Sequence, residues 1–348
     1  MKKLVAIVLT VAVLLSITAC GGKTDKTSGK NSKELNIYMW QSYISDDLIK
    51  NFEKKYDCKV NLSYMSDNAD SITKLTAGCG DEYDLVMTCD AYMKSLVAGK
   101  YIEKINTKNI PNTKNLNPSY WVEKEYSVPY LMNYIYIVYN DETCPIDITS
   151  YNDLINPALK GKITSIDGAR NLFPIALIAL GYDPNSTKEK EIKEAYEWLK
   201  KYNDNVLSYG STEQNISNGA ASVAFTYDGN ASWAMDQLGA NNKLVIADFK
   251  EDKVQLGFDL YVIPKGAKHS DLSEKFLNYI CEADVMAKNL EEFPYSCPND
   301  AAVAAASDKY KNDPARKFSY KENVFFQEDV GDALKIYNDY YQQLKVGE

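Results

Sequence analysis

The sequence predicts an α/β protein in which a mainly parallel sheet is covered by helices. Short runs rich in β-forming residues alternate with amphipathic helical runs over nearly the whole chain. The first runs follow one another as strand, helix, strand, helix, strand, an order that places the strands in one parallel sheet. The chain of 348 residues is also too long for one core of ordinary size, so we expect two lobes.

The N-terminus has the layout of a bacterial lipoprotein signal peptide. Two lysines precede an apolar run, 4–19, that ends in small residues just before Cys20. The run, about 16 residues, is shorter than the roughly 20 needed to cross a bilayer. We predict a signal peptide over 1–19, a diacylated Cys20 and a flexible polar linker over 20–33. The alternative is an uncleaved membrane anchor. Either way, the globular part is expected to be extracytoplasmic, at the outer face of the cell membrane.

The first part of the globular chain contains three predicted strands and two predicted helices. Ser45 suits the start of a helix, and Leu48 and Phe52 follow it at helical spacing. The expected strands cover 35–40, 58–64 and 83–87, and the expected helices cover 45–56 and 71–77.

The later part continues with strands and helices of a second unit. The expected strands cover 134–139, 223–227 and 258–263, and the expected helices cover 150–154, 173–180, 189–202 and 330–344. The last helix has apolar and aromatic residues near one face, so we expect the C-terminal end to pack against the fold.

Charge and rare residues exclude several classes of site. The formal net charge is -9, and removal of Lys2 and Lys3 with the signal makes it -9 - 2 = -11. Such acidity makes nucleic acid an improbable partner and mildly favours a cationic solute, although solubility explains it as well. With His269 as the sole histidine and no paired CxxC, we expect no metal and no cofactor. Six cysteines besides Cys20 allow fifteen disulfide pairings, and their spacing selects none. These are Cys58, Cys79, Cys89, Cys144, Cys281 and Cys297.

Aromatic residues follow several of the predicted strands. The aromatic residues of this kind are Trp40, Tyr43, Tyr92, Tyr227 and Trp233. Ligands of open parallel sheets bind at the carboxyl ends of the strands, where such rings can stack on methylene chains or hold ammonium groups. For each residue taken alone, the position supports packing and binding about equally.

An ordered series of motifs resembles a known family. The motifs are NIYMWQSY (36–43), YDLV (83–86), YSVPY (126–130), DGARN (167–171), FD (258–259) and FQEDVG (326–331). In this order the chain resembles the spermidine/putrescine-binding proteins of ABC transporters over nearly all of its predicted mature part. The resemblance implies a two-lobed, type II periplasmic-binding fold. It places lobe 1 at 34–140 and 259–303, and lobe 2 at 141–258 and 304–348.

The resemblance also implies which residues hold the solute. Trp40 and Tyr43 match the aromatic pair of the family's first loop, Asp259 matches a carboxylate that pairs with an amine, and Gln327 matches a polar ligand contact. Four family positions are thus retained.

Other positions of the implied site differ from the family. Cys89 stands in the stretch where the family has a serine, and Tyr92 lies one place later than the usual tyrosine. Tyr227 replaces a tryptophan. Gly168 and Asn171 replace two carboxylates that the family normally supplies.

Two interpretations of this loss remain open. Asp90, Asp167 and Asp228 lie close in sequence to the altered positions, and one interpretation is that they rebuild the cationic site. The other is that the ligand carries a single amine or a bulkier group, since Gly168 and Gly257 would enlarge the cleft. Losing two charged hydrogen bonds would weaken polyamine binding by roughly a hundredfold or more.

The resemblance implies a binding protein rather than an enzyme. We expect a monomeric lipoprotein that captures a polyamine between its lobes and delivers it to a membrane permease driven by a cytoplasmic ATPase. A sensor or adhesin on the same fold is the second possibility. An exported hydrolase is the third, although the chain lacks a Gly-x-Ser-x-Gly or His-Glu-x-x-His motif.

Overall fold

The computed structural model describes residues 33–317 and 323–347. The predicted signal peptide, Cys20 and the predicted linker up to residue 32 lie outside the described residues, while Lys33 begins the first strand. No helix in the described ranges has the length and apolarity needed to pass through a membrane. Within the same ranges, no cluster of His, Cys, Asp and Glu could hold a metal ion, and all six cysteines are free.

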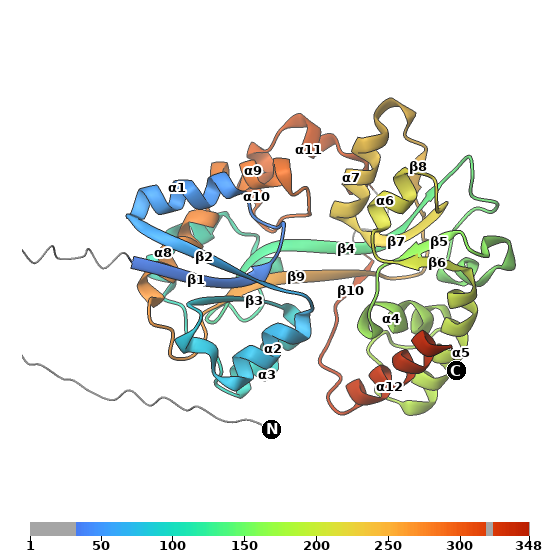
Figure 1. Ribbon diagram of the computed structural model, residues 1–348, viewed down its shortest axis with the longest axis horizontal. Coiled ribbons are helices and arrows are strands. Elements are labelled where there is room, and N and C mark those ends of the chain that lie inside the picture. The colour runs from blue at the N-terminus through green and yellow to red at the C-terminus, as the bar shows by residue number, and fades with distance from the viewer. Residues whose placement is uncertain (1–32, 318–322, 348) are drawn as a thin grey trace, which may run out of the picture. The chain divides into compact units, whose positions relative to one another are not determined.

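The described residues form one ten-stranded sheet whose central path has the order β2-β1-β3-β9-β4-β7-β5-β6 (Figure 1). The strands are β1 (Lys33–Trp40), β2 (Cys58–Met65), β3 (Leu85–Cys89), β4 (Val128–Asn140), β5 (Ile163–Ser165), β6 (Val206–Tyr209), β7 (Val223–Tyr227), β8 (Leu244–Ile246), β9 (Val254–Val262) and β10 (Val324–Phe325). The pairs β1–β2 and β1–β3 are parallel, as predicted. The pairs β5–β6 and β5–β7 are also parallel, although the sequence analysis predicted neither β5 nor β6. The middle of the sheet is antiparallel, which the periodicity did not indicate.

Two long strands join the two parallel groups. β4 pairs with β9 from Val128 to Ile135, and from Ile135 to Tyr139 it pairs with β7. β9 in turn pairs with β3 from Asp259 to Val262. Both strands are almost wholly buried, as expected for the centre of a sheet covered on both faces. The lobe boundaries inferred from the resemblance stay a prediction.

Helices cover both faces of each parallel group (Figure 1). They are α1 (Asp46–Tyr56), α2 (Asn68–Ala77), α3 (Met93–Ala98), α4 (Ala169–Ala179), α5 (Glu189–Asn205), α6 (Thr212–Ser217), α7 (Asp228–Leu238), α8 (Ser270–Ile280), α9 (Ala283–Glu292), α10 (Asp300–Ala305), α11 (Asp308–Asn312) and α12 (Ala333–Val346). α1 is typical: it buries Leu48, Ile49 and Phe52, and the Phe52 ring packs edge-on against Phe276 of α8 at 5.1 Å.

Most predicted elements are present, with local differences. The helix expected over 150–154 is a 3₁₀ turn, Tyr151–Ile155, which Pro157 prevents from extending. The C-terminal helix begins at Ala333 rather than at Val330, because Gly331 has a left-handed backbone with φ 53°.

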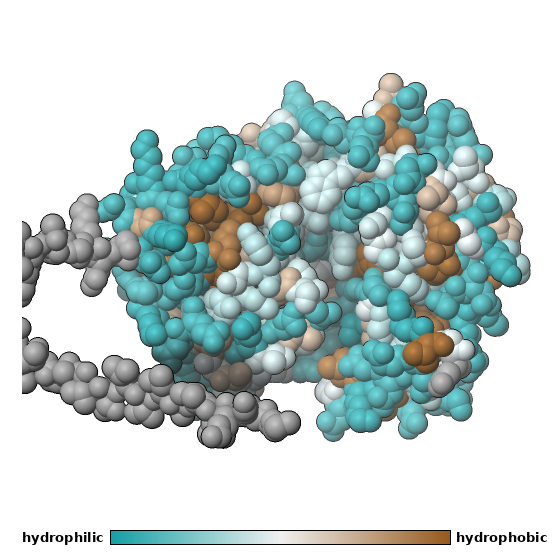
Figure 2. All heavy atoms as spheres, in the orientation of Figure 1, coloured by the Kyte–Doolittle hydropathy of each residue, from teal (hydrophilic) through white to brown (hydrophobic). Residues whose placement is uncertain are grey.

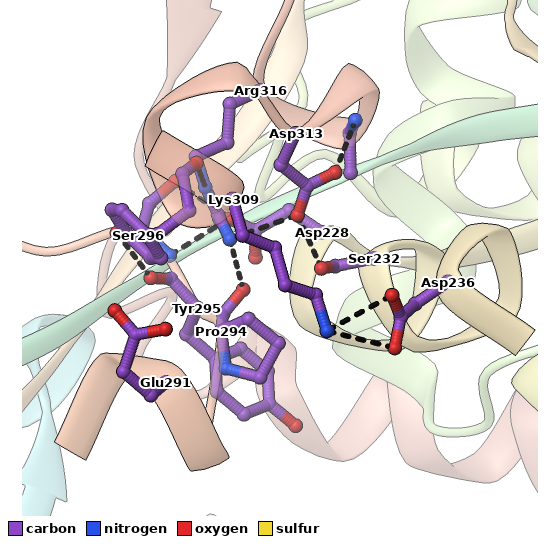
Figure 3. A network of polar contacts seen from close by, with 12 residues as sticks. Asp228, Ser232, Asp236, Glu291, Pro294, Tyr295, Ser296, Lys309, Asp313 and Arg316 are labelled. Carbon is purple, nitrogen blue, oxygen red and sulfur yellow. Dashed lines mark hydrogen bonds and ion pairs between the residues drawn. The ribbon is translucent and has the colours of Figure 1, made fainter. Parts of the chain in front are cut away.

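A buried polar network attaches the chain after α9 to α7 (Figure 3). Asp228, at the start of α7, is fully buried, and its Oδ2 accepts hydrogen bonds from the Ser296 backbone N–H at 2.9 Å and the Ser296 hydroxyl at 2.6 Å. Arg316 donates to the Pro294 carbonyl at 2.8 Å and pairs with Asp313 at 3.1 Å, while Asp313 accepts a hydrogen bond from Ser232 of α7. These contacts fix the 294–296 segment beside the sheet.

Replacing Asp228 by Asn should change how stability depends on pH. Burial raises the pKa of Asp228 from 3.8 to about 6, against the opposing effects of Arg316 and Ser296. The folded state therefore keeps a proton that the unfolded state releases. The free energy that this proton contributes to folding is fully present below about pH 4 and is lost as pH rises through about 6. We expect the unfolding free energy of the unaltered protein, minus that of Asp228→Asn, to fall by about 2 to 3 kcal/mol between pH 4 and 7.

Urea denaturation at both pH values measures this difference. Asp81→Asn serves as the control, because the Asp81 side chain is 87% exposed, and its difference should stay nearly constant. A difference that is equally constant for Asp228→Asn would contradict the assignment.

Candidate functional site

A cavity of about 460 Å³ lies at the carboxyl ends of β1, β2, β3 and β7, against β4 and β9 and the starts of α2 and α4. In the space-filling view the surface is hollowed between the part that carries α2 and α3 and the part that carries α4 and α12 (Figure 2). Its lining includes Trp40, Tyr43, Asp67, Cys89, Tyr92, Asn133, Arg170, Asn171, Tyr227, Asp259, Tyr295 and Gln327. Eight of the sequence-predicted site residues are in this group.

Asp259 is the buried charge of the cavity. β9 places it beside Cys89 of β3 and Leu131 of β4, and the residue is only 6% exposed. Its Oδ2 accepts hydrogen bonds from the Tyr43 hydroxyl at 2.5 Å and from Asn133 Nδ2 at 2.8 Å. Burial raises the pKa of Asp259, while the hydrogen bonds from Tyr43, Asn133 and Trp40 act in the opposite direction.

None of the partners of Asp259 carries a positive charge. Within the described residues, no lysine or arginine forms an ion pair with this carboxylate. A buried carboxylate is stable as an anion when a cation or several donors compensate it, and here the donors are neutral. The arrangement therefore suits a cationic group supplied from the cavity.

Aromatic rings surround this carboxylate. The Tyr43 ring lies edge-on to Tyr130 at 5.8 Å and to Tyr295 at 5.1 Å between ring centres. Burial, and secondly the charge of Asp259, raise the pKa of Tyr227 to about 12. The hydroxyl of Tyr227 therefore stays protonated at neutral pH. The faces of such rings can attract an ammonium group by cation–π interaction, and the rings can also pack against the methylene groups of an amine solute.

The opposite wall carries amides and one arginine instead of acids. Asn171 Nδ2 donates to the Asp167 carbonyl at 2.7 Å and lies 3.5 Å from the Tyr227 hydroxyl. Gln327 Nε2 donates to the Arg170 carbonyl at 2.6 Å. Gly168 caps α4 with φ 105°, a backbone that L side chains rarely adopt, and it does not line the cavity.

The three acids considered as replacements do not line the cavity. Asp90 accepts a hydrogen bond from the Phe258 backbone N–H at 3.2 Å, and burial raises its pKa to about 7. Burial alone would raise the pKa of Asp167, but hydrogen bonds from Tyr341 and Lys345 outweigh it and lower the pKa. Asp228 belongs to the polar network behind α7. Each of the three thus has its contacts within the protein.

Four of the lining residues named above lay outside the sequence-based set: Asp67, Asn133, Arg170 and Tyr295. Asn133 and Tyr295 were missed because they sit in strand-interior or irregular positions. Asn133 is inside β4, where no strand end marked it. Tyr295 belongs to the loop after α9, and its ring occupies the space above Gly229, where an added Cβ would lie 2.4 Å from the ring. The sequence signal for Tyr295 was the Tyr-Asp-Gly motif at 227–229, because a glycine after a strand leaves room for a ring from elsewhere in the chain.

Trp233 is separate from this site. It lines a second cavity of about 400 Å³ next to the polar network, together with Lys309 and Asp313. For Trp233, a position shortly after a strand was therefore not a sign that the residue lines the main cavity. Asp67 also lines the cavity and was not singled out from the sequence; in the structure it caps α2.

Comparison with known proteins agrees with this arrangement. Residues 47–318 match the family model described as bacterial extracellular solute-binding protein. The chain is 33% identical over 328 residues to the spermidine/putrescine-binding periplasmic protein of Salmonella typhimurium, with 90% of this chain and 92% of the relative covered.

Two further similarities extend over nearly the whole length. The chain is 29% identical over 365 residues to spermidine/putrescine-binding periplasmic protein 1 of Haemophilus influenzae, with 100% of each chain covered. A solved structure from Listeria monocytogenes superposes with a TM-score of 0.82 at 29% identity, covering 91% of this chain and 100% of the other. The predicted α/β fold of the type II periplasmic-binding class is thereby confirmed, and the chain belongs to the family of bacterial extracellular solute-binding proteins.

Proposed function

We propose that this protein is the solute-binding lipoprotein of an ABC importer and captures a polyamine, such as spermidine or putrescine, at Asp259. The observation that carries the proposal is a buried carboxylate that forms no ion pair with any described residue, at the edge of a cavity lined by aromatic rings. The names of the Salmonella and Haemophilus relatives support a polyamine as the solute.

The recognition chemistry follows from these groups. An ammonium group donates to Asp259, and a hydrogen bond to a charged group contributes about 1.5 to 3 kcal/mol. Trp40, Tyr43 and Tyr227 surround the aliphatic part, and each cation–π contact adds about 0.5 to 2 kcal/mol, depending on desolvation. Together these contacts favour an amine over a neutral or anionic solute.

Binding is coupled to closure of the two lobes. In this proposal lobe 1 consists of 34–140 and 259–303, lobe 2 of 141–258 and 304–348, and β4 and β9 form the connection. The cavity takes residues from both lobes, Trp40 from the first and Tyr227 from the second. A solute that contacts both sides binds the closed form more tightly and shifts the population toward it.

Delivery requires other subunits. The lipid on Cys20 tethers the monomeric protein to the outer face of the cell membrane, where the closed form docks on a permease powered by a cytoplasmic ATPase. The family is described as extracellular, which supports a location outside the cytoplasm. It is also described as solute-binding, which favours a binding role over that of a hydrolase. A sensor on the same fold would use the same closure.

One observation favours a second candidate ligand. The α4 wall has Gly168 and Asn171 where the resembled family has acids, and no carboxylate of that wall lines the cavity. A solute with one ammonium and an uncharged far end would also fit this wall. Transport and fold would be unchanged in that case.

Asp259→Asn should weaken binding of spermidine and putrescine by about 10- to 100-fold, because the neutral amide cannot pair with an ammonium. Isothermal titration of the purified protein with both amines measures the dissociation constants. The matched control is Asp252→Asn, a partly buried acid away from this cavity, which should bind like the unaltered protein. Unchanged affinity in Asp259→Asn would exclude the proposed site.

Ligand binding should also change the fluorescence of Trp40. Closure moves this ring from an open cavity into contact with solute, whereas Trp198 is buried in α5 and donates to Asn152 at 3.1 Å. We expect the putrescine-induced change in emission to disappear in Trp40→Phe and to persist in Trp198→Phe. The opposite pattern would mean that the solute binds elsewhere.

A further inference from the structure

The cavity carries an asymmetric set of charges. Among its lining residues, two are acidic, Asp67 and Asp259, and one is basic, Arg170. Asp259 accounts for one ammonium group of a bound amine. A diamine in the same cavity has a second ammonium, which needs a partner of its own because an unpaired charge is poorly tolerated in a desolvated site.

The α4 wall does not supply that partner. Asn171 presents an amide there, and the carboxylate of Asp167 faces Tyr341 and Lys345, with Lys345 Nζ at 3.0 Å. Arg170 adds a positive charge to the same wall. Like charges repel, so the second ammonium is directed away from α4.

Asp67 lies on the other side, where β2 ends and α2 begins. It caps α2, its Oδ1 accepting a hydrogen bond from the Ala69 backbone N–H at 2.7 Å, and the residue is exposed. The effect of its charge extends over the cavity. Burial is the largest cause of the raised pKa values of both Tyr92 and Tyr227, and the charge of Asp67 adds to both.

We propose that Asp67 is the second carboxylate of the cleft and pairs with the distal ammonium of a diamine or polyamine whose first ammonium is held by Asp259. This inference rests on the proposed amine-binding function. Asp67 is then the residue that separates diamines from monoamines. It provides a charge from α2 in place of the acids absent from α4.

The chemistry of helix caps offers a clean test. Asn and Ser cap helices about as well as Asp, so Asp67→Asn and Asp67→Ser keep the cap and remove the charge. Titration calorimetry with putrescine and with butylamine, which lacks the second ammonium, compares the two ligands. Both variants should bind putrescine about tenfold more weakly and butylamine within about twofold of the unaltered protein. Asp81→Asn, which removes an exposed acid outside the cavity, should change neither.

The possible results separate the two proposals. If the unaltered protein binds putrescine and both Asp67 variants bind it equally well, the role of Asp67 is refuted and the proposed function stands. Equal weakening of putrescine and butylamine, or an effect in only one of the two variants, would show a change in local shape and also refute it. If the unaltered protein binds neither amine, the proposed function is lost and this inference with it.

Discussion

The antiparallel pairing of β4 with β9 is the constraint on which the rest of the structure depends. These two strands connect the parallel group β1–β3 to the parallel group β5–β7, so their register sets which strand ends face the common cavity. They also supply its central polar contact, since Asp259 comes from β9 and Asn133 from β4. A slip of one residue would turn both side chains to the other face of the sheet, because side chains alternate along a strand. The candidate binding site and the connection between the two groups are therefore built from the same two strands.

Local patterns predicted β1, β2, β3 and β7 and the helices α1, α2, α4 and α5, but they missed the short strands β5 and β6. In α1 the apolar spacing directly reflects which face is buried, whereas β1 buries three consecutive residues, Ile37 to Met39. β4 and β9 are buried on both faces, so their sequences have no alternation from which direction or partner could be inferred. The same limit applies to Asn133 and Tyr295, whose places in the cavity depend on tertiary packing: one on strand register, the other on the bare backbone of Gly229.

The acids near the altered positions show why proximity in sequence is a weak guide to a charged site. Asp90, Asp167 and Asp228 each lie within a few residues of a strand end, yet each carboxylate is held by contacts within the protein. A buried or half-buried carboxylate is stabilised by any suitable donor, and backbone N–H groups and lysines compete with a ligand for it. The carboxylate that does line the cavity besides Asp259 is Asp67, which the sequence did not single out and which caps α2. One residue can do both, since a carboxylate has more acceptor sites than a cap requires.

In the proposed function, the state of Asp259 couples solute binding to closure of the cavity. Without solute, three neutral donors from Trp40, Tyr43 and Asn133 hold the carboxylate, and burial raises its pKa. A bound ammonium supplies the missing positive charge and removes part of that desolvation penalty, so it stabilises the anion in the position where Tyr43 already holds it. The proposed closure would deepen the burial, strengthen the attraction between the two charges and exclude the water that competes with it. A neutral solute gains nothing from this cycle, because it leaves the buried carboxylate without a counter-charge. In the proposed function, selectivity for amines and closure of the lobes thus have one physical origin.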